Sequence, residues 1–257
     1  MKFVSGIGSL ILNFANITGK VSIFTFEAVV GIFRFPIYFR VILKQMLEIG
    51  YYSLPVVGLT AIFTGAVLAL QSYTGFSRFS AESSIATVVV LSITRELGPV
   101  LAGLMVAGRI GASIAAEIGT MKVTEQIDAL ATLSTNPIKY LVTPRLIACV
   151  TMLPCLVLVA DIIGIYGGYL VAVYKIGFNP AIYLKNTFIY LERMDVITGV
   201  VKSAIFGFII AIIGCYCGYN SKRGAQGVGS ATTNAVVVSS ILILLSNYII
   251  TGLFFVK

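Results

Sequence analysis

Two ionisable residues stand side by side inside an apolar run, Arg95 and Glu96 in the segment SITRELGPV. A charge within a bilayer costs a few kcal/mol unless it is paired or hydrated. In one interpretation Arg95 snorkels outward and Glu96 satisfies a neighbouring chain. In the other, the pair forms a polar rim on an otherwise apolar cavity that holds a lipid. Neighbouring residues of a helix point about 100° apart, so the two need not pair with each other.

A second intramembrane acid, Asp161, lies in the next apolar run and is followed by Gly164, Gly167 and Gly168. Small residues of this kind favour close helix packing. No basic residue stands near Asp161 in the sequence. The pattern therefore favours a structural hydrogen bond or a water-lined position, and it leaves a proton relay open.

Other chemistries have little support in the sequence. The chain has no histidine, and its four cysteines lie in apolar runs, where they are typical packing residues. We therefore expect neither a catalytic site nor a metal site. No GxxxxGK[ST] phosphate loop occurs, so ATP and its Mg²⁺ would have to bind to another chain and we expect no cofactor on this one.

The composition indicates an integral membrane protein. Of 257 residues 58% are hydrophobic and 11% are charged, whereas a soluble domain has about 25% charged residues. The net charge of +8 would suit nucleic acid, but in a membrane chain it reflects cytoplasmic loops and lipid headgroups. We expect no nucleic-acid partner.

The apolar pattern predicts an all-α membrane protein with an N-terminal interfacial part, residues 1–48, and a membrane domain, residues 49–257. Lys2 to Lys20 has the pattern of an amphipathic helix lying in the interface. Phe24 to Lys44 is apolar but basic, and we predict an elbow along the cytoplasmic surface with a kink at Pro36. Five spans follow, at about 49–73, 84–116, 145–174, 196–219 and 231–256.

The distribution of Lys and Arg predicts the orientation. With the N-terminus inside and the C-terminus outside, most basic residues lie on the cytoplasmic side, as the positive-inside rule requires. The cytoplasmic set is Lys2, Lys20, Arg34, Arg40, Lys44, Arg109, Lys122, Lys139, Arg145, Lys222 and Arg223. The outer set is Arg78, Lys175, Lys185, Arg193 and Lys257, with Lys202 near an outer helix end.

The segment AAEIGTMKVTEQIDAL, Ala115 to Leu130, is unusually polar for this chain. Thr120 can cap a helix whose apolar face includes Val123 and Ile127, and Asn136-Pro137 ends it. The polar face carries Lys122, Glu125, Gln126 and Thr132. We predict a short amphipathic helix on the cytoplasmic side, which either rests on headgroups or docks a cytoplasmic partner.

Several blocks of sequence resemble the MlaE/YrbE family of ABC transporter permeases. The main block is RELGPVLAGLMVAGRIGASIAAEIGTMKVTEQIDAL, and others are SAESS, NPIKYLVTPRLIA, ERMD and GYNSKRGAQGVGSATTNAVV. The resemblance covers roughly residues 40 to 257. It implies a homodimeric permease in the bacterial inner membrane that has no enzymatic activity of its own. The implied partners are a cytoplasmic ABC ATPase, a periplasmic MCE-domain lipid-binding protein and phospholipid, moved between the two membranes of a Gram-negative envelope.

The resemblance also implies two sets of site residues. An outward-facing lipid cavity at the dimer interface would be lined by Leu68, Tyr73, Phe76, Phe79, Arg95, Glu96 and Leu97. A coupling helix for the ATPase would use Glu117, Thr120, Lys122, Val123, Glu125, Gln126 and Asp128. The loop SYTGFSRFSAESS departs from the family pattern at Gly75, Phe76 and Arg78.

Two alternatives remain at this point. A proton-coupled secondary transporter would use Glu96 or Asp161, although no internal repeat typical of such transporters is present. An intramembrane lipid enzyme would need a nucleophile and a base that converge, and no motif supplies them.

Overall fold

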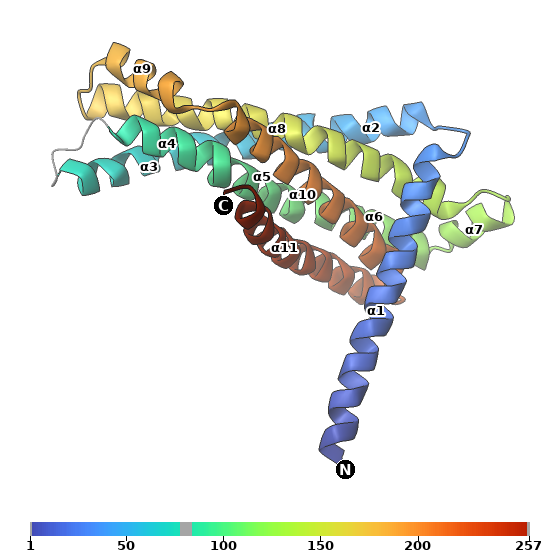
Figure 1. The fold of residues 1–257 in the computed structure, drawn as a ribbon. Helices are drawn as coiled ribbons and strands as arrows, with labels where there is room; N and C mark the ends of the chain where they lie inside the picture. The colour runs from blue at the N-terminus through green and yellow to red at the C-terminus, as the bar shows by residue number, and fades with distance from the viewer. Residues whose placement is uncertain (1, 78–83, 256–257) are drawn as a thin grey trace.

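The computed structural model describes residues 2–77 and 84–255, and it confirms the all-α membrane class. Long helices lie side by side in a bundle, with α7 (Gln126–Thr132) at one end and α9 (Pro180–Tyr190) at the other (Figure 1). These two ends are named the α7 end and the α9 end below.

Within the described residues five helical rods make up the bundle, and each is longer than the roughly 20 residues that a bilayer requires. The first comprises α2 (Phe39–Ile49), η1 (Tyr51–Ser53) and α3 (Leu54–Phe76). The second comprises α4 (Ile85–Ser92), η4 (Ile93–Leu97), α5 (Gly98–Val106), η5 (Ala107–Gly111) and α6 (Ala112–Val123). The third comprises η6 (Ile138–Val142), α8 (Thr143–Leu170) and η7 (Val171–Lys175), and the last two are α10 (Arg193–Tyr219) and α11 (Ala225–Phe255). The first rod, 38 residues or about 57 Å long, exceeds the hydrocarbon thickness of about 30 Å.

Four of the five rods begin earlier than the predicted spans, and the second, which begins at Ile85, continues past the predicted end at 116 to Val123. The third starts at Ile138 and not near 145, because η6 adds a turn before Pro144. The predicted elbow is also divided differently. Its first part belongs to α1 (Lys2–Phe33), the break that we predicted at Pro36 separates the helices, and α2 then leads through η1 into the first span.

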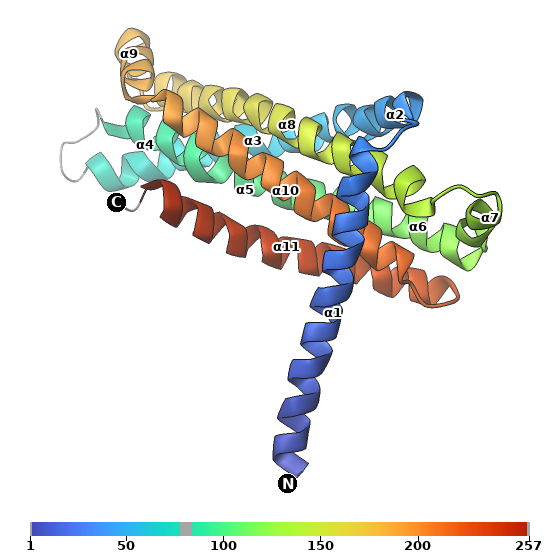
Figure 2. The same ribbon diagram turned by 45° about the vertical axis from the view of Figure 1, so that its right-hand side comes forward.

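Helix α1 runs across the bundle near the α7 end, and both views show this crosswise course (Figures 1 and 2). Its segment Ala15–Phe33 is apolar and long enough to cross a membrane, yet only 17% of it is buried. The C-terminal half contacts the bundle through Phe24, whose ring lies 5.6 Å from that of Tyr216, and through Ala28, whose carbonyl oxygen accepts a hydrogen bond from Thr143 at 3.1 Å. The crosswise course suits an interfacial helix better than a sixth span.

Close backbone contact joins α3 to α8. A Cβ atom on Gly65 would collide with the backbone of Gly164, and one on Gly167 would collide with the carbonyl of Ile62. Small residues let helices approach at this distance, where van der Waals packing drives association in lipid. The packing role predicted for the glycines after Asp161 is thus confirmed.

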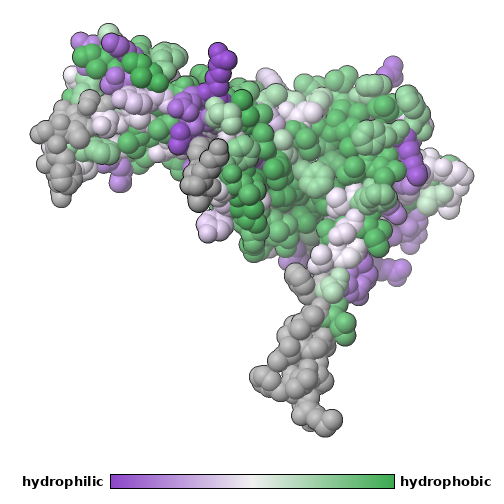
Figure 3. Space-filling view, in the orientation of Figure 1, coloured by the Kyte–Doolittle hydropathy of each residue, from purple (hydrophilic) through white to green (hydrophobic). Residues whose placement is uncertain are grey.

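The surface of the bundle fits a bilayer. Apolar residues cover the middle of the face in Figure 3, and hydrophilic residues gather toward the two ends. Candidate membrane segments among the described residues have mean hydropathies up to 2.6. The protein is therefore a multi-pass membrane protein.

Candidate functional site

The second rod changes its helical geometry at Arg95 and Glu96. Residues Ile93–Leu97 form the π-helical turn η4, and Pro99 follows at the start of α5. Proline has no N–H, so the carbonyl oxygen of Arg95 lacks the donor that an α-helix would supply four residues later. Short π-helical turns often occur at functional sites.

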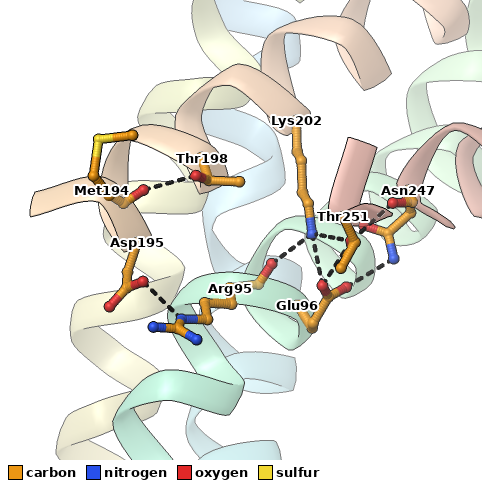
Figure 4. A network of polar contacts seen from close by, with 8 residues as sticks. All are labelled: Arg95, Glu96, Met194, Asp195, Thr198, Lys202, Asn247 and Thr251. Atoms are coloured by element: carbon orange, nitrogen blue, oxygen red, sulfur yellow. Dashed lines mark hydrogen bonds and ion pairs between the residues drawn. The ribbon is translucent and has the colours of Figure 1, made fainter. Parts of the chain in front are cut away.

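Lys202 of α10 occupies the position that this turn opens. Its side chain is fully buried, and its Nζ donates hydrogen bonds of 2.8 Å to the Arg95 carbonyl, Glu96 Oε1 and Thr251 Oγ1. Asn247 of α11 donates from Nδ2 to the other carboxylate oxygen of Glu96, also at 2.8 Å. Figure 4 shows these side chains meeting from three rods. The ammonium thus has three acceptors, which is its full hydrogen-bonding capacity.

Arg95 points away from Glu96 toward the start of α10. Its Nε lies 2.6 Å from Oδ1 of Asp195, a side chain that is 1% exposed. Asp195 also accepts a hydrogen bond from the backbone N–H of Glu192 at 3.2 Å, as half of a capping box that begins α10. The pair therefore joins the π-helical turn to the first turn of α10, and the two predicted neighbours have separate partners.

The network balances two cations against two carboxylates, which lowers the cost of holding them at this depth. It is not sealed, because the side chains of Arg95 and Glu96 are 33% and 37% exposed. Exposed ionic groups on a membrane-facing surface are costly, so this face needs water or protein against it. The close approach depends on Gly199, where a Cβ atom would lie 2.8 Å from the Thr94 carbonyl oxygen.

The other predicted lipid contacts are divided between two places. Leu97 lines a narrow cavity between α3, α5 and α8 with a volume of about 10 Å³. Leu68, Tyr73 and Phe76 pack instead against an apolar cluster around Ile85 and Val89, and the ring of Tyr73 lies 6.1 Å from that of Phe178. Phe79 lies outside the described residues. The cavity at Leu97 is below the usual 300–1,000 Å³ of a ligand pocket, so a phospholipid does not fit within it.

Asp161 is buried against the same π-helical turn. A Cβ atom on Gly98 would collide with Oδ1 of Asp161, and this oxygen has no hydrogen-bond partner among the described residues. Asp161 lies between Ala160 and Ile162 on α8, one turn from Gly164 in the wall of the Leu97 cavity. The structural hydrogen bond that we considered for Asp161 is therefore not formed by Oδ1 within the described residues.

At the α7 end, the predicted amphipathic helix is divided in two. Thr120 is inside α6, where its hydroxyl donates back to the carbonyl of Ala116, so it does not cap a helix. The chain turns at Glu125, which has φ 60°, and α7 begins at Gln126. Ile127 anchors α7 in the core at 1% exposure, and Lys122 reaches from α6 to Asp128 at 3.1 Å. The prediction of a single helix capped by Thr120 was therefore wrong, because the pattern of side chains does not reveal a residue with a left-handed backbone conformation.

The polar residues of this tip differ in accessibility. Glu125, Gln126 and Asp128 are exposed, and Val123 is half-buried. Glu117 forms an ion pair of 2.8 Å with Arg145, whose side chain is only 4% exposed. Arg145 also donates to the carbonyl of Leu141 at 2.6 Å. The α6–α7 tip is thus tied to the start of α8.

Sequence reasoning missed several members of the network. Lys202, which we placed near an outer helix end, is fully buried. Asp195 was noted only within the block ERMD, and Asn247 and Thr251 were not singled out. The available signal was a lysine in one apolar helix and a carboxamide in another, since such residues inside membrane segments need partners.

The fold and the network define a class, a multi-pass helical membrane protein in which ionic side chains are held between helices. The family profile described as Permease MlaE matches residues 42–253, and the chain belongs to this family of ABC transporter permeases. A probable ABC transporter permease protein of Rickettsia bellii is 67% identical over 99% of this chain and 98% of the relative.

Two further relatives carry more specific names. The intermembrane phospholipid transport system permease protein MlaE of Haemophilus influenzae is 34% identical over 99% of this chain and 98% of its own length. The chloroplastic protein TRIGALACTOSYLDIACYLGLYCEROL 1 of Arabidopsis thaliana is 38% identical over 92% of this chain and 67% of its own length.

Proposed function

We propose that the chain moves phospholipid between the inner and outer membranes of a Gram-negative envelope, as a homodimer in the inner membrane with a cytoplasmic N-terminus. The family membership and the name of the Haemophilus relative support this. The proton-coupled alternative is weaker, because the family is one of ABC permeases and because Glu96 is bound by the ammonium of Lys202.

The observation that carries the proposal is the half-exposed ionic face of the π-helical turn. Arg95 and Glu96 reach the surface of an otherwise apolar bundle, and the cavity beside them is too small for a phospholipid in one chain. A second copy placed against this face would enclose a larger, outward-facing cavity with the charges at its mouth and Leu97 in its wall. Apolar walls suit acyl chains, because burial there contributes about 25 cal/mol per Å².

A separate ATPase would drive transport through the α6–α7 tip. Glu125, Gln126 and Asp128 face outward there, while Ile127 and the Lys122–Asp128 bridge keep α7 fixed on α6. A push on α7 would reach α8 through the Glu117–Arg145 pair. ATP and Mg²⁺ would bind to that partner chain, and a periplasmic MCE-domain protein would exchange lipid at the α9 end.

Photo-crosslinking in the assembled complex tests the lipid cavity. A photoreactive amino acid at Leu97 should capture labelled phospholipid, and one at Leu245, an exposed residue of α11, is the control for annular lipid. The expected result is capture at Leu97 that ATP turnover reduces, with capture at Leu245 unchanged by ATP. Equal capture at both positions, with no effect of ATP, would show annular lipid only.

A pull-down tests the coupling tip. Glu125→Lys should weaken binding of the ATPase while leaving the membrane bundle folded, because Glu125 is exposed and lies in the turn between α6 and α7. Wild-type recovery of the ATPase together with wild-type hydrolysis would remove Glu125 from the interface.

A further inference from the structure

A hollow with a volume of about 650 Å³ lies at the α7 end, where α1, the break before α2 and residues 134–139 meet. It is far along the bundle from the Arg95–Glu96 network. Both ribbon views show the α1–α2 turn and the α7–α8 connection at this end.

The hollow contains a particular set of charges. Arg34 and Lys139 supply two cations, and Glu27 supplies one carboxylate. Lys139 is held in place by a 2.6 Å hydrogen bond from its Nζ to the carbonyl of Phe35. Glu27 and Arg34 are exposed and have no ion-pair partner among the described residues. Glu27 lies in the last two turns of α1, and Arg34, seven positions further on, is the first residue after the helix, a rise of about 10 Å along its axis.

An apolar surface continues from the hollow along α2. Phe35, Phe39, Leu43 and Leu47 are 86%, 68%, 60% and 63% exposed. Leu43 and Leu47 also line an apolar groove between α2 and α8 with a volume of about 510 Å³. The eleven residues of α2 span about 16 Å, close to half of the hydrocarbon thickness of about 30 Å. A headgroup in the hollow would therefore leave its acyl chains along α2 within one leaflet.

We propose that this corner, bounded by Glu27, Arg34, Lys139 and α2, binds a phospholipid whose headgroup carries a phosphate and a primary ammonium, such as phosphatidylethanolamine. Arg34 and Lys139 take the phosphate, because cationic donors bind phosphate oxygens through charge-assisted hydrogen bonds. Glu27 takes the ammonium and disfavours headgroups that carry only negative charge. The site differs from the proposed transport cavity in residues and in position, and it requires only that the chain spans a membrane.

Lipid titration of the purified full-length protein in detergent, followed by native mass spectrometry, tests the site. Phosphatidylethanolamine and phosphatidylglycerol with the same acyl chains are compared, with soluble O-phosphoethanolamine as the arm without chains. In the wild type we expect phosphatidylethanolamine to bind at least threefold more tightly than phosphatidylglycerol, with one such lipid per chain. O-phosphoethanolamine at the same concentration should not displace it.

Three variants separate the roles. Arg34→Gln should weaken the binding of both lipids at least fivefold. Glu27→Gln should make the two lipids bind with equal affinity. Lys44→Gln removes an exposed cation of α2 that does not line the hollow, so it should bind as the wild type does. All three positions are exposed, so unchanged thermal midpoints should show that each variant is folded. The proposal fails if Arg34→Gln matches Lys44→Gln, if phosphatidylglycerol binds more tightly in the wild type, or if O-phosphoethanolamine alone displaces the lipid.

Discussion

Replacing Lys202 by methionine should destabilise the bundle through the carboxylate that it leaves behind. Methionine fills a similar volume but donates no hydrogen bond, so Glu96 and the Arg95 carbonyl lose their partner. Removing one member of a buried ion pair costs about 3–5 kcal/mol. Glu96 is 37% exposed and keeps hydrogen bonds from Asn247 and Thr251, so solvent and these donors reduce the loss. We expect about 2–3 kcal/mol.

The double variant Lys202→Met/Glu96→Gln separates this cause from lost packing. Replacing both partners removes the uncompensated charge, so it should recover at least half of the loss. Thermal unfolding of the detergent-solubilised protein, followed by fluorescence size-exclusion chromatography, gives the order of the midpoints. By the scaling of soluble proteins the single variant should fall about 4–12 °C. Lys222→Met, at an exposed position in the turn before α11, should shift the midpoint little. A double variant as unstable as the single one would refute the charge argument.

Three further predictions follow from contacts elsewhere in the bundle. Gly98→Ala should destabilise the protein by about 1–3 kcal/mol, because the added Cβ atom would collide with Oδ1 of Asp161. Asp161→Ala should relieve this collision in the double variant, whereas the control Gly108→Ala, which meets open space, should be neutral. Thermal midpoints test these variants, and a double variant whose loss equals the sum of the two single losses would contradict the contact. Arg145→Met should destabilise the protein by about 2 kcal/mol, because Arg145 is buried and pairs with Glu117. It should weaken ATPase binding less than Glu125→Lys does, because Arg145 lies behind the tip. The thermal midpoint tests the first effect and the pull-down the second, and an unchanged midpoint would refute the structural role of Arg145. Cysteines introduced in place of Lys222 and Lys185 should be labelled from opposite sides of the membrane, the first from the cytoplasm. The background for this test has serine in place of the exposed Cys155. Labelling of the cysteine at position 222 from outside would reverse the predicted orientation.

The sequence by itself determined the class and the order of the elements. Hydrophobic runs of membrane length specify helices in a bilayer wherever they occur, because each backbone polar group must be satisfied within its own segment. The break at Pro36 and the close packing at Gly164 were also predicted, because proline and glycine act on the backbone locally. The sequence also marked Arg95 and Glu96 as residues that need partners.

Only the tertiary structure decided who those partners are. Lys202 and Asn247 lie 106 and 151 residues beyond Glu96 in the chain. The local sequence of each helix does not specify which other helices it packs against. The predicted amphipathic helix is divided at Glu125, whose backbone has a left-handed φ angle. The identity of the Glu125 side chain does not predict this conformation. The hollow at Arg34 likewise depends on a crosswise α1 meeting the connection before α8, an approach set by long-range packing at Phe24 and Ala28. Periodicity reports which face of a helix is apolar, whereas the choice of neighbour depends on the shapes and charges of surfaces distant in the chain.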